Sequence, residues 1–88
     1  MKIIKVSSKS KPNSVAGALA NILKEKDQIE VQVIGAGALN QLVKALIICR
    51  GHLIPLGIDI VFIPSFSEVK IDNIDKTGIK MLIKKVDQ

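Results

Sequence analysis

Apolar residues recur along this 88-residue chain at two spacings, and each spacing predicts one kind of element. Spacings of three and four residues are typical of a helix with one buried face, and they occur in two stretches. The first predicted helix follows Pro12, which suits a first helical turn, and runs to about Lys26. The second ends near Arg50-Gly51, where glycine suits a left-handed cap, and its apolar face comprises Leu39, Leu42, Val43, Leu46 and Ile47.

Short stretches rich in isoleucine and valine predict four strands, at residues 2–7, 30–34, 58–63 and 78–86. Pro64 marks either the end of the third strand or a position at a sheet edge, because proline has no N–H to donate. Residues 67–76 are polar and mostly acidic, and they predict a connecting loop with some strand character at 69–71.

The predicted order is β-α-β-α-β-β, which fits a single domain over residues 1–88. Short loops and right-handed crossovers place both helices on one face of a mixed four-stranded sheet. We therefore expect the α/β class in its α+β form, a two-layer sandwich with one uncovered sheet face. The third strand is apolar on both sides, so one set of side chains packs under the helices and the other faces water. Such a patch marks a partner surface and predicts self-association, unless loops half cover it.

Charge and aromatic content narrow the range of partners. The chain has 13 Lys and Arg against 8 Asp and Glu, a formal net charge of +5 and a pI near 9.6. The aromatic residues are Phe62 and Phe66 alone, which excludes an aromatic platform for base stacking. A basic protein without such a platform still binds phosphate backbones through lysine and arginine.

The basic charge is concentrated at the two ends of the chain, and an acidic stretch separates them. Residues 1–11 hold four lysines and no acid, residues 59–75 have a net charge of −3, and residues 76–88 have +3. Lys9 and Lys11 precede the first predicted helix, where free backbone N–H groups and the helix dipole also favour anions. This pattern predicts a phosphate-binding feature. The alternative is that these lysines are ordinary solvated surface.

Motifs for catalysis, metals and cofactors are incomplete. Gly35-Ala-Gly37 joins a strand to a helix, but the third glycine of a dinucleotide fingerprint would fall on Asn40. The N–H groups of that turn could still hold a phosphate. Cys49 and His52 could share a helical face, yet two ligands do not make a metal site. No carboxylate pair is placed for acid–base work, so the sequence predicts a non-enzyme without a metal or a cofactor.

Cysteine usage and hydropathy bear on where the protein works. A single cysteine excludes an intrachain disulfide. The first apolar stretch is broken by Lys5 and is too short for a signal peptide, and no run approaches the roughly 20 apolar residues of a membrane span. We therefore expect a cytoplasmic protein that has no membrane partner.

Four stretches of the chain indicate its relatives more specifically than its composition does. They are residues 6–18 (VSSKSKPNSVAGA), residues 34–45 (IGAGALNQLVKA), Arg50-Gly51 and residues 63–66 (IPSF). With them, essentially the whole chain closely resembles the stage V sporulation protein S family. The resemblance implies a bacterial relative of the Alba fold, with the same order of elements, that forms dimers and binds DNA or RNA. It also implies a role in spore development or gene regulation.

The resemblance also implies where nucleic acid would bind. Lys9 and Lys11 match the lysine-containing loop that faces nucleic acid in Alba proteins, and Asn13 matches the start of the following helix. Four further residues lie on the segment that matches Alba's second helix. The implied nucleic-acid-binding residues are thus Lys9, Lys11, Asn13, Asn40, Gln41, Lys44 and Arg50.

Two features of this sequence depart from the Alba pattern. Alba proteins commonly carry arginines at the turn before the second helix, and here residues 35–38 are glycine and alanine. The hairpin between the last two strands reaches along the DNA groove in Alba, and here it carries Glu68, Asp72 and Asp75. Both departures weaken the attraction to phosphate.

Two functions follow from these observations. The first is a sequence-tolerant binder of DNA or RNA that acts as a homodimer or homotetramer in sporulation or gene regulation. The alternative is a protein-interaction module that recruits another sporulation protein through the open apolar sheet face, with the basic charge serving solubility.

Overall fold

The computed structural model describes residues 3–86 of the chain. Its elements are β1 (Ile3–Lys5), α1 (Pro12–Glu25), β2 (Gln28–Val33), α2 (Ala36–Leu53), the 3₁₀ turn η1 (Ile54–Leu56), β3 (Ile60–Ile71) and β4 (Ile74–Lys85). The predicted order of strands and helices is therefore confirmed. Lys2, which we assigned to the first strand and to the basic N-terminal block, lies outside the described residues.

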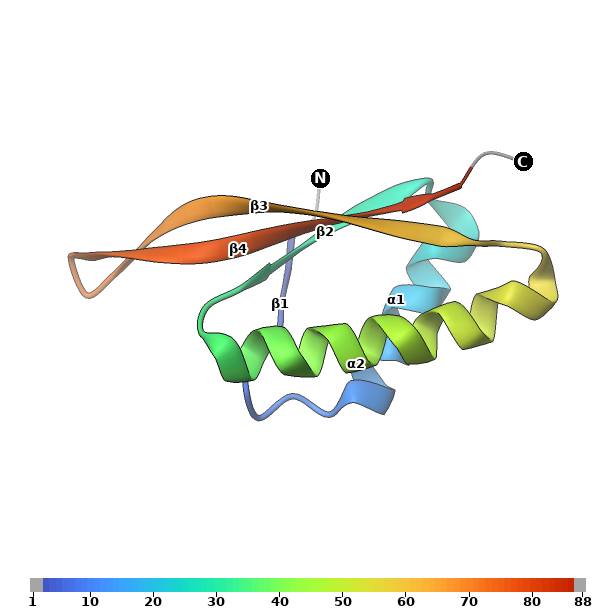
Figure 1. The fold of residues 1–88 in the computed structure, drawn as a ribbon, viewed down its shortest axis with the longest axis horizontal. Coiled ribbons are helices and arrows are strands. Elements are labelled where there is room, and N and C mark those ends of the chain that lie inside the picture. Colours follow the sequence, from blue (N-terminus) through green and yellow to red (C-terminus); the bar gives the residue numbers. More distant parts are fainter. Residues whose placement is uncertain (1–2, 87–88) are drawn as a thin grey trace.

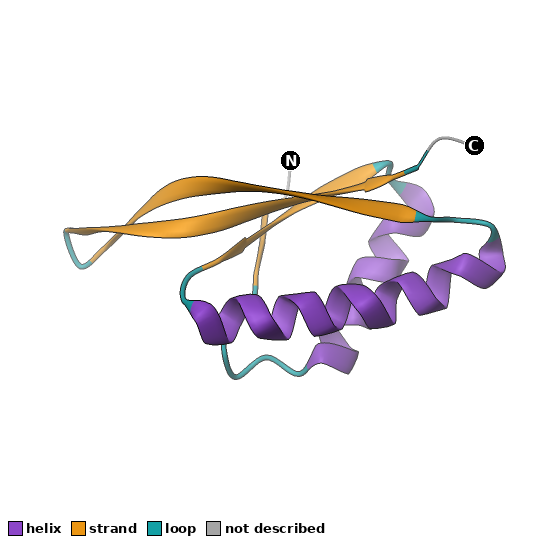
Figure 2. Cartoon of the chain, in the orientation of Figure 1, coloured by secondary structure: helices purple, strands orange, loops and turns teal. Residues whose placement is uncertain are grey.

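The four strands form one mixed sheet in the order β1-β2-β4-β3. β1 runs parallel to β2, and the two other neighbouring pairs are antiparallel. Both helices cover the same face of this sheet, and the opposite face is open (Figures 1 and 2). The structure thus has the predicted class, an α+β two-layer arrangement of two helices on a mixed four-stranded sheet.

The core lies between the sheet and the two helices. Ile29, Val31 and Val33 alternate with half-buried polar residues along β2, so that one face of this strand is apolar and buried. Leu42 and Leu46 of α2 are fully buried in the same cluster. Each such side chain contributes about 1.5–3 kcal/mol when it is removed from water, so the helical layer is held mainly by aliphatic burial.

The second helix is longer than the sequence predicted. It continues past Gly51 because Leu53 is fully buried and extends the apolar face of the helix by one more turn. The left-handed cap falls instead on Gly57, whose φ of 78° follows the 3₁₀ turn. The N–H of Ile58 donates to the carbonyl of Leu53 at 3.2 Å and closes this end of the helix.

The predicted loop at residues 67–76 is wrong, although the strand character expected at 69–71 is confirmed, because these residues end β3. β3 and β4 are two paired 12-residue strands that extend as a hairpin arm beyond the rest of the sheet (Figure 1). Only Asp72 and Asn73 connect them, with φ of 51° and 63°. Two successive left-handed residues make a tight hairpin turn, and Asp and Asn tolerate that conformation. Pairing between the two strands thus outweighs the polar composition of the segment.

Pro64 lies in the middle of β3, which is the outer strand of the sheet. The alternative that Pro64 occupies an edge position is therefore confirmed. In a hairpin with a two-residue turn, Ile71 and every second residue before it bond to the partner strand. Pro64 belongs to the other set, so the N–H that proline lacks would have pointed away from the sheet.

The third strand exposes apolar side chains on both faces. Val61 and Ile63 lie on the open face of the sheet and are 45% and 48% exposed. On the helical side Ile60 is buried, whereas Phe66 is 83% exposed because it lies on the part of the strand that leaves the core. The predicted apolar patch exists, and self-association through it stays a prediction.

Candidate nucleic-acid interface

The loop between β1 and α1 lies against the first turns of α2. A Cβ atom added to Gly37 would meet the Cβ of Ser8 at 3.0 Å, so the two backbones approach closely at this point. One turn further along, the Nε2 of Gln41 donates a hydrogen bond of 2.9 Å to the carbonyl oxygen of Ser10. These contacts fix the lysine-bearing loop, residues 7–11, to the helix.

Serine side chains give this loop its own internal order. The N–H of Ser7 donates to the Oγ of Ser10 at 2.9 Å, and the N–H of Lys9 donates to the Oγ of Ser7 at 3.2 Å. The N–H of Ser10 in turn donates to the carbonyl of Ser7 at 3.1 Å. Lys9 thus lies in an ordered turn with its side chain exposed. The serines beside the two lysines are typical of a loop that leads into a helix, and the structure shows the turn that they form.

The starts of both helices lie beside this loop without acidic or capping side chains. Lys11 is the N-cap of α1, and Gly35 is the N-cap of α2. Neither helix has a side-chain cap or an acid in its first turn, so the dipole and the N–H groups of these turns add positive potential to that of the lysines.

Lys44 extends the basic surface along α2. It lines a shallow hollow of about 420 Å³ with Pro12 and Asn13 from the start of α1 and two isoleucines of α2. Asn40 is exposed one turn before Lys44 on the outward side of the same helix. The structure therefore brings six of the seven implied residues to one seam between the loop, the start of α1 and the first half of α2. They are Lys9, Lys11, Asn13, Asn40, Gln41 and Lys44.

Gln41 has a different role from the others. It is half-buried, and its side-chain amide is engaged by the Ser10 carbonyl. The family resemblance implied a contact to nucleic acid at this position, and in the structure the Gln41 side chain supports the loop that carries Lys9 and Lys11.

Arg50 lies apart from the seam. Six residues of helix separate it from Lys44, a rise of about 9 Å. Its guanidinium forms a two-point ion pair with Asp59, at 2.7 Å from Nε and 3.2 Å from the terminal nitrogen. The hydrogen bond from Arg50 and a second one from the N–H of Ile60 lower the pKa of the Asp59 carboxyl. The same hydrogen bond and the carboxylate charge raise the pKa of Arg50.

The seam lies in a part of the chain that is free of acids. No aspartate or glutamate occurs in the first 24 residues or between residues 31 and 58. The acids of the hairpin arm lie elsewhere, and one of them, Asp75, is 3.9 Å from the ammonium group of Lys70. The sequence therefore places no carboxylate close along the chain to Lys9, Lys11 or Lys44.

Other chemistry is sparse in the described part of the chain. Within residues 3–86, no three His, Cys, Asp or Glu side chains gather as a metal site would require. Cys49 is fully buried, and desolvation raises the pKa of its thiol. None of the helices in the described range is long and apolar enough to cross a membrane.

The two helices on a mixed four-stranded sheet form an Alba-like fold. The solved structure of Alba from Thermoplasma volcanium matches it with a TM-score of 0.64, over 94% of this chain and 99% of that chain. The two sequences are 16% identical, so this similarity concerns the fold alone. Residues 2–86 match the family model described as Stage V sporulation protein S. The chain therefore belongs to the stage V sporulation protein S family.

Proposed function

We propose that this protein binds DNA or RNA through the phosphate backbone, with little dependence on sequence, and acts as a non-enzymatic regulator of sporulation in the cytoplasm. The observation that carries the proposal is the seam in which the loop of residues 7–11 is fixed to the start of α2. A rigid loop presents its lysines without the entropy cost of ordering a mobile segment on binding.

The polar residues of the seam and Arg50 contribute differently in this proposal. Lys9, Lys11 and Lys44 supply the charges that replace counterions on phosphates. Asn13 and Asn40 are exposed amides that donate hydrogen bonds to phosphate or sugar oxygens. Arg50 makes the weakest contribution, because its charge is already paired with Asp59.

The protein acts as a homodimer or homotetramer in this proposal. Three lysines in one protomer offer few phosphate contacts, and two protomers on one strand or duplex double that number. Exposed apolar residues supply surface for such assembly: Val43 and Ile47 on α2, and Val61, Ile63 and Phe66 on β3. Light scattering should give a mass of two or four chains, and a strict monomer would contradict this part of the proposal.

A fluorescence anisotropy titration at several salt concentrations tests nucleic-acid binding. Three phosphate contacts per protomer, or six per dimer, predict a slope of about −5.4 in log affinity against log salt for duplex DNA, which is about 1,800-fold weaker binding for a fourfold rise in salt. Changing Lys9, Lys11 and Lys44 together to Gln should remove that slope. Lys84→Gln is the matched control, because Lys84 is an exposed lysine on the open face of the sheet, away from the helices. No binding to any duplex or single strand at low salt would refute the proposal.

The open sheet face supports a second function, the recruitment of a protein partner. Val61 and Ile63 lie there next to Leu82, away from the helices and from the basic seam. Ile63→Lys distinguishes the two functions. If the first is correct, the variant should keep salt-dependent nucleic-acid binding through its lysines, weakened only as far as this face contributes to assembly. If the protein works only as an interaction module, the wild type should show no salt-dependent binding at all, and Ile63→Lys should abolish partner binding.

A further inference from the structure

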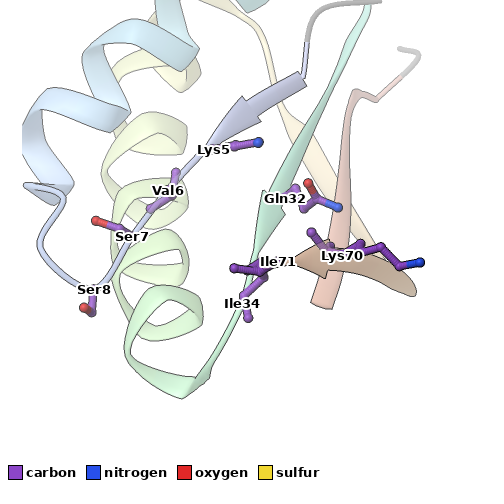
Figure 3. Close-up of a pocket in the computed structure, with 9 residues that line it drawn as sticks. Lys5, Val6, Ser7, Ser8, Gln32, Ile34, Lys70 and Ile71 are labelled. Carbon is purple, nitrogen blue, oxygen red and sulfur yellow. The ribbon is translucent and has the colours of Figure 1, made fainter. Parts of the chain in front are cut away.

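A cavity lies between the body of the protein and the hairpin arm, on the open side of the sheet. It has a volume of about 380 Å³, and Figure 3 shows the end of β1, the end of β2 and the far half of β3 converging on it. Residues 5–8 and residues 69–71, which meet there, are more than 60 residues apart in sequence. Its lining is Lys5, Val6, Ser7, Ser8, Gln32, Ile34, Val69, Lys70 and Ile71. It is distinct from the basic seam, none of whose six residues lines it.

The lining combines a cation and hydroxyls with an aliphatic wall. Lys5 brings a cation to the rim of the cavity, and none of the lining residues is acidic. The ammonium group of Lys70 points away from the cavity (Figure 3) and lies 3.9 Å from Asp75. Ile34 is half-buried and Ile71 is 40% exposed, so these two form an apolar wall that a ligand can reach, whereas Val6 is buried in the core. Lysine is a common ligand of phosphate, whereas a flat apolar group fits against aliphatic side chains.

Gln32 is held in a fixed position at the edge of the cavity. Its Nε2 donates a hydrogen bond of 3.2 Å to the Oγ of Ser67. Gly78 lies between the strands that carry these two residues, and a Cβ there would approach the Ser67 Oγ at 3.2 Å and the Val33 carbonyl at 3.0 Å. One N–H and the carbonyl oxygen of the Gln32 amide remain, and these are the groups with which glutamine recognises base edges.

We propose that this cavity binds a nucleotide, with the phosphate at Lys5 and the base against Ile34 and Ile71 beside the Gln32 amide. The volume falls within the range of about 300–1,000 Å³ that is typical of small-ligand sites. The nucleotide is either free or the phosphorylated end of a strand. This inference does not depend on the proposed binding of duplex backbones, because the residues differ and a single nucleotide suffices.

Nuclear magnetic resonance titrations of the whole chain test the proposal with four probes: AMP, adenosine, ribose 5-phosphate and inorganic phosphate. AMP should shift the amide signals of residues 5–8, 32–34 and 69–71 in a saturable way. The three partial ligands should bind more weakly, because each lacks the base or the phosphate. Equal affinity for AMP and inorganic phosphate would overturn the nucleotide assignment, as would shifts confined to residues outside the cavity. A short oligonucleotide with and without a 5′-phosphate distinguishes a strand end from a free nucleotide.

Charge variants locate the phosphate. Lys5→Gln should weaken AMP binding by about tenfold or more, because it removes a charge-assisted contact with the phosphate, whereas Lys70→Gln should change it little. Both side chains are exposed, so the fold is unaffected, which the unchanged amide spectrum outside the cavity verifies. Lys84→Gln, also exposed, is the matched control and should bind AMP as the wild type does. Unchanged AMP affinity in Lys5→Gln would refute the proposal.

Duplex binding and AMP binding, measured on the wild type and on the variant of the three seam lysines, distinguish failure of this proposal from failure of the proposed function. Replacement of Lys9, Lys11 and Lys44 should abolish duplex binding and leave AMP binding intact. If duplex binding is absent in the wild type while AMP still binds at the cavity, only the proposed function fails. If the duplex binds and AMP does not, only the cavity proposal fails.

Discussion

Gly37→Ala tests whether the contact between the loop of residues 7–11 and α2 controls binding. Alanine at this position places its Cβ 3.0 Å from the Cβ of Ser8, whereas carbon atoms in contact are normally 3.5–4.0 Å apart. Ser8 is on an exposed turn, so we expect the loop to move away by about half an ångström or more rather than the helix to unfold. Lys9, the next residue, moves with it.

The magnitude follows from comparison with Gly51 in the same helix. Gly51 has no atom within 4 Å of an added Cβ, so Gly51→Ala should gain the full helix propensity, about 1 kcal/mol. For a domain of this size, that gain raises Tm by about 4–8 °C. Gly37→Ala should gain less, because the contact with Ser8 opposes the gain in propensity. Its affinity for nucleic acid should fall, whereas that of Gly51→Ala should not.

Thermal unfolding and fluorescence anisotropy on both variants measure the two effects separately. Ser8→Gly in the Gly37→Ala background removes the clashing Cβ and should restore affinity, which makes the pair a double-mutant cycle. A Gly37→Ala protein that is as stable as Gly51→Ala and binds as tightly as the wild type would refute the reasoning. It would show that the position of the loop on α2 does not matter for binding.

Three further predictions concern stability and reactivity. Leu46→Ala should lower the free energy of unfolding by about 2–5 kcal/mol in urea titrations, because Leu46 is fully buried between helix and sheet. The lowered pKa of Asp59 means that its ion pair with Arg50 stabilises the fold fully above the unfolded pKa of about 4. This contribution disappears as pH falls through the lower native pKa, so Asp59→Asn should flatten the acid limb of a urea-midpoint curve. Cys49 should react with a thiol reagent only after unfolding, and fast reaction of the native protein would contradict its burial.

Local patterns were sufficient for most of the fold, because the buried faces repeat at regular spacing. Alternation along β2 and the spacing of Leu42 and Leu46 on α2 each mark one apolar face, and the observed core uses both. The family resemblance indicated the loop of residues 7–11, because the stretch that resembles the family runs without a break from residue 6 to residue 18.

The hairpin arm could not be recognised from its composition. Its polar side chains face water on a two-stranded ribbon, so no buried face imposes alternation of apolar and polar residues. One signal was available: Asp72-Asn73 lies between Ile71 and Ile74, and an Asp-Asn pair between two apolar residues suits a tight turn. The Arg50–Asp59 pair was equally hidden, because it joins residues whose approach depends on where α2 ends.

The site depends on α2 more than on the arm that extends furthest from the body. One side of α2 buries Leu42 and Leu46 in the core, and another holds the loop through Gly37 and Gln41. The outward side presents Lys44. Because a single rigid helix does all three, a core substitution that tilts α2 should move the loop and Lys44 together. Loss of affinity in such a variant would therefore report on helix position even where the binding residues themselves are unchanged.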